Sequence, residues 1–134
     1  MIRFFVTTAL IAGFVSVTPV SAQVTITIGS ETPRVCPDQP PQPEWVDRIP
    51  LREAHNKVLI QQMYRAQSMQ AVAESGDCSC ETRFPTWENV ETTFLEAYAD
   101  LDRWGATERT EEYRNLANEH RKIAKPICEH QGNW

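Results

Sequence analysis

The stretch Ser75-Gly76-Asp77-Cys78-Ser79-Cys80 determines how this chain is organised, because it follows an amphipathic segment and places two cysteines two residues apart. Glycine adopts the left-handed conformation that closes a helix, so Gly76 is predicted to end a helix. The chain has an even set of four cysteines: Cys36, Cys78, Cys80 and Cys128. An even set in a short chain is typical of disulfides formed in an oxidising compartment.

An export signal at the start of the chain agrees with such a compartment. Arg3 precedes an apolar run from Phe4 to Val17, and Val20-Ser21-Ala22 supplies the small residues that a signal peptidase requires. The run is too short to cross a bilayer core of about 30 Å comfortably, and no second apolar run follows it. Residues 1–22 are therefore predicted to be a signal peptide. The mature chain would begin at Gln23, be periplasmic or secreted, and have no stable membrane insertion after cleavage.

The size and charge of the mature chain restrict its partners. Loss of residues 1–22 leaves 112 residues, which is enough for one domain. Removal of Arg3 with the leader leaves 12 basic and 18 acidic residues, so the net charge becomes −6. An acidic protein is repelled by phosphate backbones and anionic lipids, so no nucleic-acid partner is expected.

Residues 23–49 are predicted to form an extended, proline-rich arm. The alternation over residues 24–28 predicts a short strand that adds to a partner's sheet, or else a frayed terminus. Six prolines between Glu31 and Pro50 favour extended or polyproline backbone. Cys36 lies within this arm, so a disulfide is expected to strap the arm across the helices.

Residues 50–134 contain three amphipathic segments, which predict an all-α, disulfide-stapled three-helix bundle. The first segment runs from Pro50 to Gly76. The second begins at a capping residue, Thr86, and ends at Gly105. The third begins at a cap on Thr107, and Pro126 is expected to disrupt its last turn.

The second and third segments each carry an apolar seam with three- and four-residue spacing, which is expected to face the core. The seam of the second segment is Trp87, Val90, Phe94, Ala97, Leu101 and Trp104. The seam of the third segment is Tyr113, Leu116, His120, Ile123 and Ile127. His120 is therefore interpreted as a hydrogen-bonded core residue rather than as a catalytic base.

In an antiparallel bundle with short joints, the four cysteines gather at one pole. Three pairings are possible. A bond between Cys78 and Cys80 would close a small, strained ring. Two long-range bonds are therefore favoured, in which Cys36 pairs with one member of the Cys78/Cys80 pair and Cys128 pairs with the other. The sequence leaves open which member takes which partner.

The same pole offers an alternative function as a metal-binding protein. The residues Cys78, Cys80, Cys128 and His130 could present three thiolates and one imidazole, a set that suits zinc or copper. The oxidising compartment, and a Cys36 left without a partner, argue against this site, so no metal and no cofactor are expected. A Cys-x-Cys pair in a loop also differs from the Cys-x-x-Cys motif of thiol oxidoreductases.

Catalytic motifs are missing from the sequence. It contains no Gly-x-Ser-x-Gly, no phosphate-binding loop and no His-Glu-x-x-His, so the chain is not expected to be an enzyme. Two tryptophans, Trp45 and Trp134, lie outside the predicted seams. They could cover the bundle or bind a partner, because tryptophan is enriched at interface hot spots. Together with Phe84 and Arg83, they are the predicted partner-binding residues.

The stretch Ser75-Gly76-Asp77-Cys78-Ser79-Cys80-Glu81-Thr82-Arg83-Phe84-Pro85-Thr86-Trp87 is distinctive. With the closing Ile127-Cys128-Glu129 and Gly132-Asn133-Trp134, it resembles small exported proteins encoded beside conjugal type IV secretion genes in alphaproteobacteria. The resemblance implies a periplasmic accessory role in plasmid transfer, as a helical pilus-tip or channel-associated component. The expected function is therefore that of a non-enzymatic interaction protein with an envelope protein as its partner.

Overall fold

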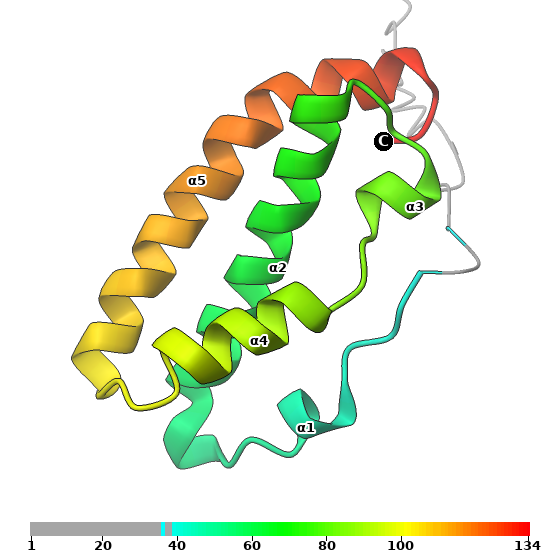
Figure 1. The fold of residues 1–134 in the computed structure, drawn as a ribbon. Helices are drawn as coiled ribbons and strands as arrows, with labels where there is room; N and C mark the ends of the chain where they lie inside the picture. Colours follow the sequence, from blue (N-terminus) through cyan, green and yellow to red (C-terminus); the bar gives the residue numbers. More distant parts are fainter. Residues whose placement is uncertain (1–35, 37–38) are drawn as a thin grey trace, which may run out of the picture. The chain divides into compact units, whose positions relative to one another are not determined.

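A computed structural model describes residue 36 and residues 39–134 of the chain. Its elements are α1 (Glu44–Asp47), the 3-10 turn η1 (Leu51–Glu53), α2 (Ala54–Ser75), α3 (Cys80–Arg83), α4 (Glu88–Ala97) and α5 (Arg103–His130). This part of the chain contains no strand (Figure 1). The predicted all-α, disulfide-stapled bundle is confirmed, with α2, α4 and α5 as its longer helices. The predicted signal peptide (1–22) and strand (24–28) lie outside the described residues.

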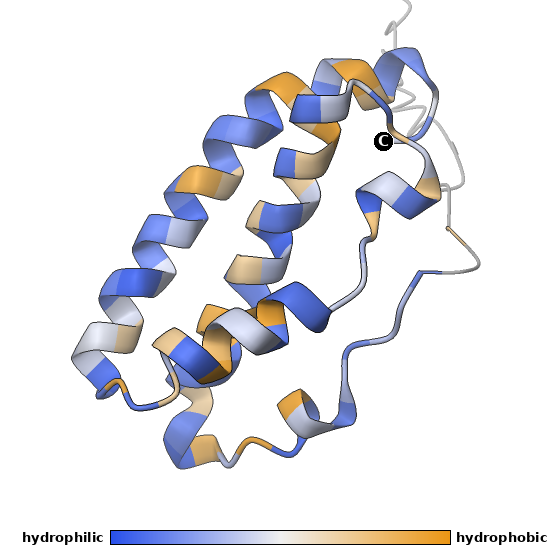
Figure 2. Ribbon diagram, in the orientation of Figure 1, coloured by the Kyte–Doolittle hydropathy of each residue, from blue (hydrophilic) through white to orange (hydrophobic). Residues whose placement is uncertain are grey.

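The two longest helices, α2 and α5, lie against each other and form the frame of the bundle (Figure 1). The residues that α5 buries are mostly small: Ala106, Thr110, Ala117, Ala124 and Cys128. They recur at intervals of four or seven positions, as in the contact stripe of a packed helix pair. Small side chains let two helix backbones approach closely. Figure 2 shows that hydrophobic and hydrophilic residues alternate along α5.

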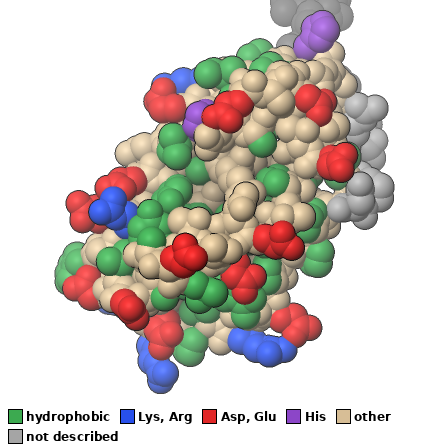
Figure 3. Space-filling view, viewed as in Figure 1, with side chains coloured by type: hydrophobic (Ala, Val, Ile, Leu, Met, Phe, Trp, Pro, Cys, Tyr) green, Lys and Arg blue, Asp and Glu red, His purple; other side chains and the backbone are tan. Residues whose placement is uncertain are grey.

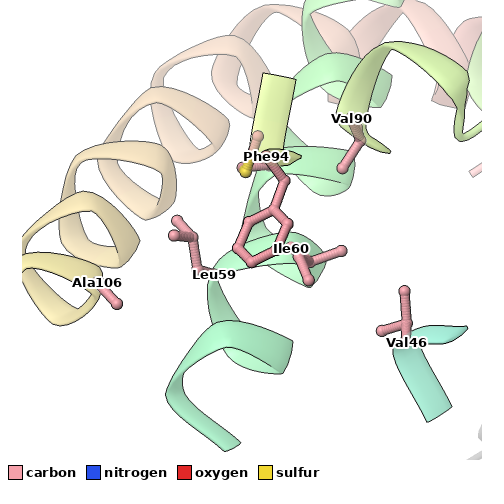
Figure 4. Packing of buried hydrophobic residues seen from close by; sticks show 7 residues of the cluster. Val46, Leu59, Ile60, Val90, Phe94 and Ala106 are labelled. Carbon is pink, nitrogen blue, oxygen red and sulfur yellow. The ribbon is translucent and has the colours of Figure 1, made fainter. Parts of the chain in front are cut away.

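The main hydrophobic core lies where α1, α2, α4 and the start of α5 meet. Its buried residues are Val46, Leu59, Ile60, Met63, Val90, Phe94 and Ala106. Figure 4 shows the Phe94 ring between Leu59 and Ile60, with Val46 on the side of α1. Trp45 stacks on Phe94 with 6.1 Å between ring centroids, so Trp45 covers this core.

The prolines predict an extended arm, but part of the arm is helical. One helical turn, α1, forms between Pro43 and Pro50, where no proline interrupts the backbone. An ion pair between Arg48 and Glu44 spans this turn, and Val46 is fully buried against the core. Burial of Val46 favours a turn here, because the apolar side chain reaches the core only when the backbone folds inward.

The first predicted helix is confirmed at its Gly76 end, but its first turn is the 3-10 turn η1 and α2 itself begins at Ala54 rather than at Pro50. The boundary between the second and third helices was predicted wrongly. Gly76 closes α2 with a φ of 70°. In contrast, α4 begins after Trp87 without a side-chain cap and ends at Ala97, well before Gly105. Thr86 therefore does not cap α4. The intervening turn leads directly into α5.

Asp102, rather than Thr107, caps α5. The Asp102 carboxylate accepts a hydrogen bond of 2.8 Å from the backbone N–H of Gly105. Thr107 lies inside the helix, where its hydroxyl donates to the carbonyl of Arg103 at 2.8 Å. Gly105 suits this first turn because a Cβ there would lie 3.2 Å from Leu101 Cδ2.

The predicted seam of the third helix was also wrong, by about one residue. Ala117 and Ala124 are fully buried, whereas Leu116 and Ile123 are 40% and 54% exposed. Close packing on α2 selects the smaller side chains and turns the larger ones to the flank. Trp104, which had been assigned to the core, is 78% exposed on the first turn of α5.

Pro126 does not end α5, which continues to His130. Proline has no N–H for the carbonyl four residues earlier, so it bends a helix without necessarily ending it. Figure 1 shows the last turns of α5 at an angle to the rest of the helix. The bend falls in the part of α5 that carries Cys128.

We predict that the substitution Asp102→Ala lowers the free energy of unfolding by about 1 kcal/mol, because it removes the cap of the longest helix. The matched substitution Thr107→Ala, at an exposed position inside the helix, should change stability by less than about 0.5 kcal/mol. Urea unfolding followed by circular dichroism measures both. Equal losses, or a larger loss for Thr107→Ala, would contradict the observed cap.

Candidate functional site

Two disulfides form one pole of the bundle. Cys36 bonds Cys80, and Cys78 bonds Cys128, with Cα–Cα distances of 5.5 and 5.1 Å. The predicted pair of long-range bonds is confirmed, and the connectivity that the sequence left open is now assigned. Every cysteine lies within the described residues, and none is free. A smaller apolar cluster surrounds the Cys78–Cys128 bond and includes Val72 and Ala124.

A hydrogen-bonded clasp joins the end of the chain to the loop after α2. Gln131 donates from its amide to the carbonyl of Gly76 at 2.9 Å and accepts from the backbone N–H of Cys78 at 2.8 Å. Asn133 is buried, and its side-chain amide donates to the carbonyl of Cys78. The clasp therefore holds the backbone on both sides of the Cys78–Cys128 bond.

Asp77 organises the turn between the two adjacent cysteines. Its carboxylate accepts from the hydroxyl and backbone N–H of Ser79 at 2.6 and 3.0 Å, and from the Thr82 hydroxyl at 2.7 Å. These bonds, led by the Ser79 hydroxyl, lower the pKa of Asp77 below its usual value of 3.8. Their contribution to stability is complete above the ordinary pKa of an aspartate and is lost as the pH falls through the lowered one.

The outer surface of this pole is a stack of alternating aromatic rings and guanidinium groups. The Arg83 guanidinium lies 5.2 Å from the Phe84 ring centroid and 5.3 Å from the Trp134 ring centroid. Arg121 lies 5.2 Å from the same Trp134 ring. Both distances to Trp134 are within the range of cation–π attraction. We refer to Arg83, Phe84, Arg121 and Trp134 as the cystine-pole stack.

Arg83 is fixed in this stack by more than its ring contacts. Its guanidinium donates to the carbonyl of Asn133, and its own backbone carbonyl accepts from the hydroxyl of Ser68 on α2. Partial burial lowers the pKa of Arg83. Neither Arg83 nor Arg121 has a salt-bridge partner within residues 39–134.

The loop after α3 is held on α2 by side chains of α2. Tyr64 donates its hydroxyl to the carbonyl of Pro85 at 2.9 Å, and Gln67 donates to the carbonyl of Thr86 at 3.3 Å. The Tyr64 ring also stacks on Trp87 with 3.8 Å between centroids. These contacts explain how a loop without regular structure can place Phe84 reproducibly beside the disulfides.

Three of the four predicted partner-binding residues therefore come together: Arg83, Phe84 and Trp134. Trp45 does not join them, because it packs on Phe94 in the main core. Sequence reasoning missed Arg121. The available signal was its position on α5, seven residues before Cys128 and hence on the same helix face.

The alternative metal set does not assemble in this structure. The sulfurs of Cys78, Cys80 and Cys128 are all in disulfides, so none is a thiolate that could bind an ion. Among the described residues, no three His, Cys, Asp or Glu side chains are grouped as metal ligands would be. His130 lies exposed at the end of α5.

The chain matches no protein-family model, no curated protein sequence and no solved structure. The helices of the described region include none with the length and apolar character needed to span a bilayer. Functional interpretation therefore depends on the geometry of the pole and on the surface of the bundle.

The disulfide assignment predicts how paired cysteine substitutions behave. The matched pairs, Cys36→Ala with Cys80→Ala and Cys78→Ala with Cys128→Ala, should leave no reactive thiol. Each should lower the free energy of unfolding by about 4 kcal/mol, because the lost bonds close loops of 44 and 50 residues.

A mismatched pair, Cys36→Ala with Cys78→Ala, serves as the control. It should leave two reactive thiols, or a rebuilt bond with a melting temperature below that of both matched variants. Thiol titration under denaturant and thermal unfolding measure these outcomes. A mismatched variant more stable than the matched ones would show that the assigned connectivity is wrong.

Proposed function

We propose that this chain is a non-enzymatic interaction protein of the periplasm or the secreted space, and that it binds an envelope protein through the cystine-pole stack. We further propose that it serves as an accessory component of conjugal transfer or type IV secretion. The resemblance of residues 75–87 and of the closing residues to exported accessory proteins supports this second part. The leader-like sequence of residues 1–22 and the two disulfides support an oxidising location.

The main support for the proposal is the exposure of Trp134 and the charge of its neighbours. Its ring is only partly buried and lies against two guanidinium groups, Arg83 and Arg121, that have no carboxylate partner in residues 39–134. Tryptophan and arginine are the residue types most enriched at interface hot spots. Two unpaired cations beside a large aromatic ring would suit a partner surface that offers carboxylates.

Rigidity of the pole supports the same proposal. The disulfides, the clasp of residues 131–133 and the bonds from α2 fix the stack before any partner arrives. A preorganised surface loses little conformational entropy on binding, so more of the contact energy is available for affinity.

We predict that Trp134→Ala and Arg121→Gln each reduce co-purification with the envelope partner by at least about tenfold, because hot-spot truncations commonly cost more than 1.4 kcal/mol. Matched controls lie at the other end of α5, where Trp104→Ala and Arg103→Gln change an exposed tryptophan and an exposed arginine. These controls should retain the partner. Capture is measured in a host that carries the transfer genes, with circular dichroism to check helicity.

Melting temperature separates partner binding from a purely structural role of Trp134. A lower melting temperature with full partner capture would show that Trp134 only covers the disulfide cluster. Unchanged capture and unchanged plasmid transfer in both pole variants would reject the proposed function.

A further inference from the structure

A second surface, on the side of the bundle, is separate from the cystine-pole stack. A cavity of about 170 Å³ opens where α2, α4 and α5 meet. Met63, Ala66 and Val90 are buried residues on its lining, and Gln67, Thr93 and Leu116 also line it. The base of the cavity is therefore apolar, while amide and hydroxyl groups stand at its sides.

An apolar stripe on α5 passes through Leu116 on the cavity lining and continues beyond the cavity. The stripe that was predicted to enter the core (Tyr113, Leu116, His120, Ile123 and Ile127) lies beside the buried alanine seam. Its members Leu116 and Ile123 remain 40% and 54% exposed. They are seven residues apart, so both point to the same side of the helix. We call the cavity and this stripe together the side groove.

The walls of the side groove differ in charge. The helix α5 carries both signs, and four of its six Lys and Arg form salt bridges with its own glutamates, whereas α4 carries acidic residues and no basic one. Between residues 66 and 102, which include the second half of α2 and all of α4, Arg83 is the single basic residue against eight acidic ones. Arg83 is held in the cystine-pole stack, away from the cavity lining. Four of these carboxylates (Glu88, Glu91, Glu96 and Asp100) are in no salt bridge within the described part of the chain.

Figure 3 shows the same distribution on this face of the molecule. Hydrophobic side chains are spread over it among scattered Asp and Glu, while Lys and Arg lie toward its margins. Apolar side chains bordered by polar or charged ones are the usual composition of an interface. Because four acidic residues beside the groove lack salt bridges within the described chain, a partner with basic residues is favoured.

We infer that the side groove binds an amphipathic helix of a partner protein, with apolar residues at i, i+4 and i+7 and with Lys or Arg on its flanks. The exposed part of the stripe, from Leu116 to Ile123, is about 10 Å long, which corresponds to roughly two turns of helix. A helix in this position would extend the layer that α4 begins, packed on α2 and α5. Its basic flank would lie toward the acidic α4. This inference adds a surface and does not depend on the cystine-pole stack.

The test uses pure components. Two synthetic amphipathic helical peptides of about four turns share one leucine pattern, and carry either Lys or Glu on the flanks. The oxidised protein should bind the Lys peptide at least about tenfold more tightly than the Glu peptide, and added salt should weaken this preference. Calorimetric titration measures the affinities.

Substitutions locate the binding site. The double variant Leu116→Gln with Ile123→Gln should weaken binding of the Lys peptide by at least about tenfold, because two apolar contacts are lost. Leu95→Gln is the matched control, since Leu95 is 59% exposed on α4 but does not line the cavity. Leu95→Gln should bind the peptide as the parent does. If the double variant has a lower melting temperature, Ile123→Gln alone serves as the test.

Several results would overturn the inference. Equal binding of both peptides would show that the partner helix needs no basic flank. Undiminished binding by the groove variants would show that the peptide does not bind in the side groove. A dimer in sedimentation equilibrium that the groove variants abolish would identify a second copy, rather than a partner helix, as the occupant. The titration contains only the purified protein and the peptides, without the envelope partner. A negative result would therefore reject the side groove as a binding site and leave the proposed function unaffected.

Discussion

The rest of the structure depends on one constraint, which is that Cys78 and Cys80 fix two distant parts of the chain at a single point. Cys80 holds the arm through Cys36, and Cys78 holds the end of α5 through Cys128. The two closed loops overlap, so together they span nearly all of the described chain. This cross-linking matters because the core contains many small residues, and small residues bury little apolar area. Both candidate surfaces depend on it, since the pole and the α2–α5 frame end at these bonds.

Features that depend on local chemistry could be predicted from the sequence. The glycine stop at residue 76, the amphipathic character of α4 and α5, and the preference for long-range disulfides are of this kind. The seam of α5 could not be predicted, because periodicity favours Leu116 and Ile123 as the most hydrophobic positions. Packing against α2 instead selects the adjacent Ala117 and Ala124, since alanine allows closer contact. The break between α4 and α5 was missed for a related reason. The apolar seam through Trp104 predicts one helix that continues to Gly105, whereas Asp102 is also a good helix cap and predicts a new helix start. The structure shows that Asp102 caps α5.

The candidate site was partly predictable for a geometric reason. Arg83, Phe84 and Trp134 are each close in sequence to a cysteine of the pole, so the disulfides bring them together. Trp45 is nine residues from Cys36, which in an extended chain is a reach of about 30 Å. That distance is enough to carry Trp45 along α2 to the main core, where it packs on Phe94. Arg121 and the side groove were not predicted, because both arise from how α5 is rotated against its neighbours.

The adjacent cysteines have a consequence for oxidative folding. Exchanging their partners would close loops only two residues shorter, and the loop-closure entropy of the two arrangements then differs by less than about 0.1 kcal/mol. Chain statistics therefore cannot distinguish native from exchanged bonds. The selection must come from noncovalent structure: Gln131 and Asn133 grip the backbone of Cys78, while Cys80 begins α3. These contacts hold Cys78, rather than Cys80, next to the end of α5, so they favour the native partner of Cys128.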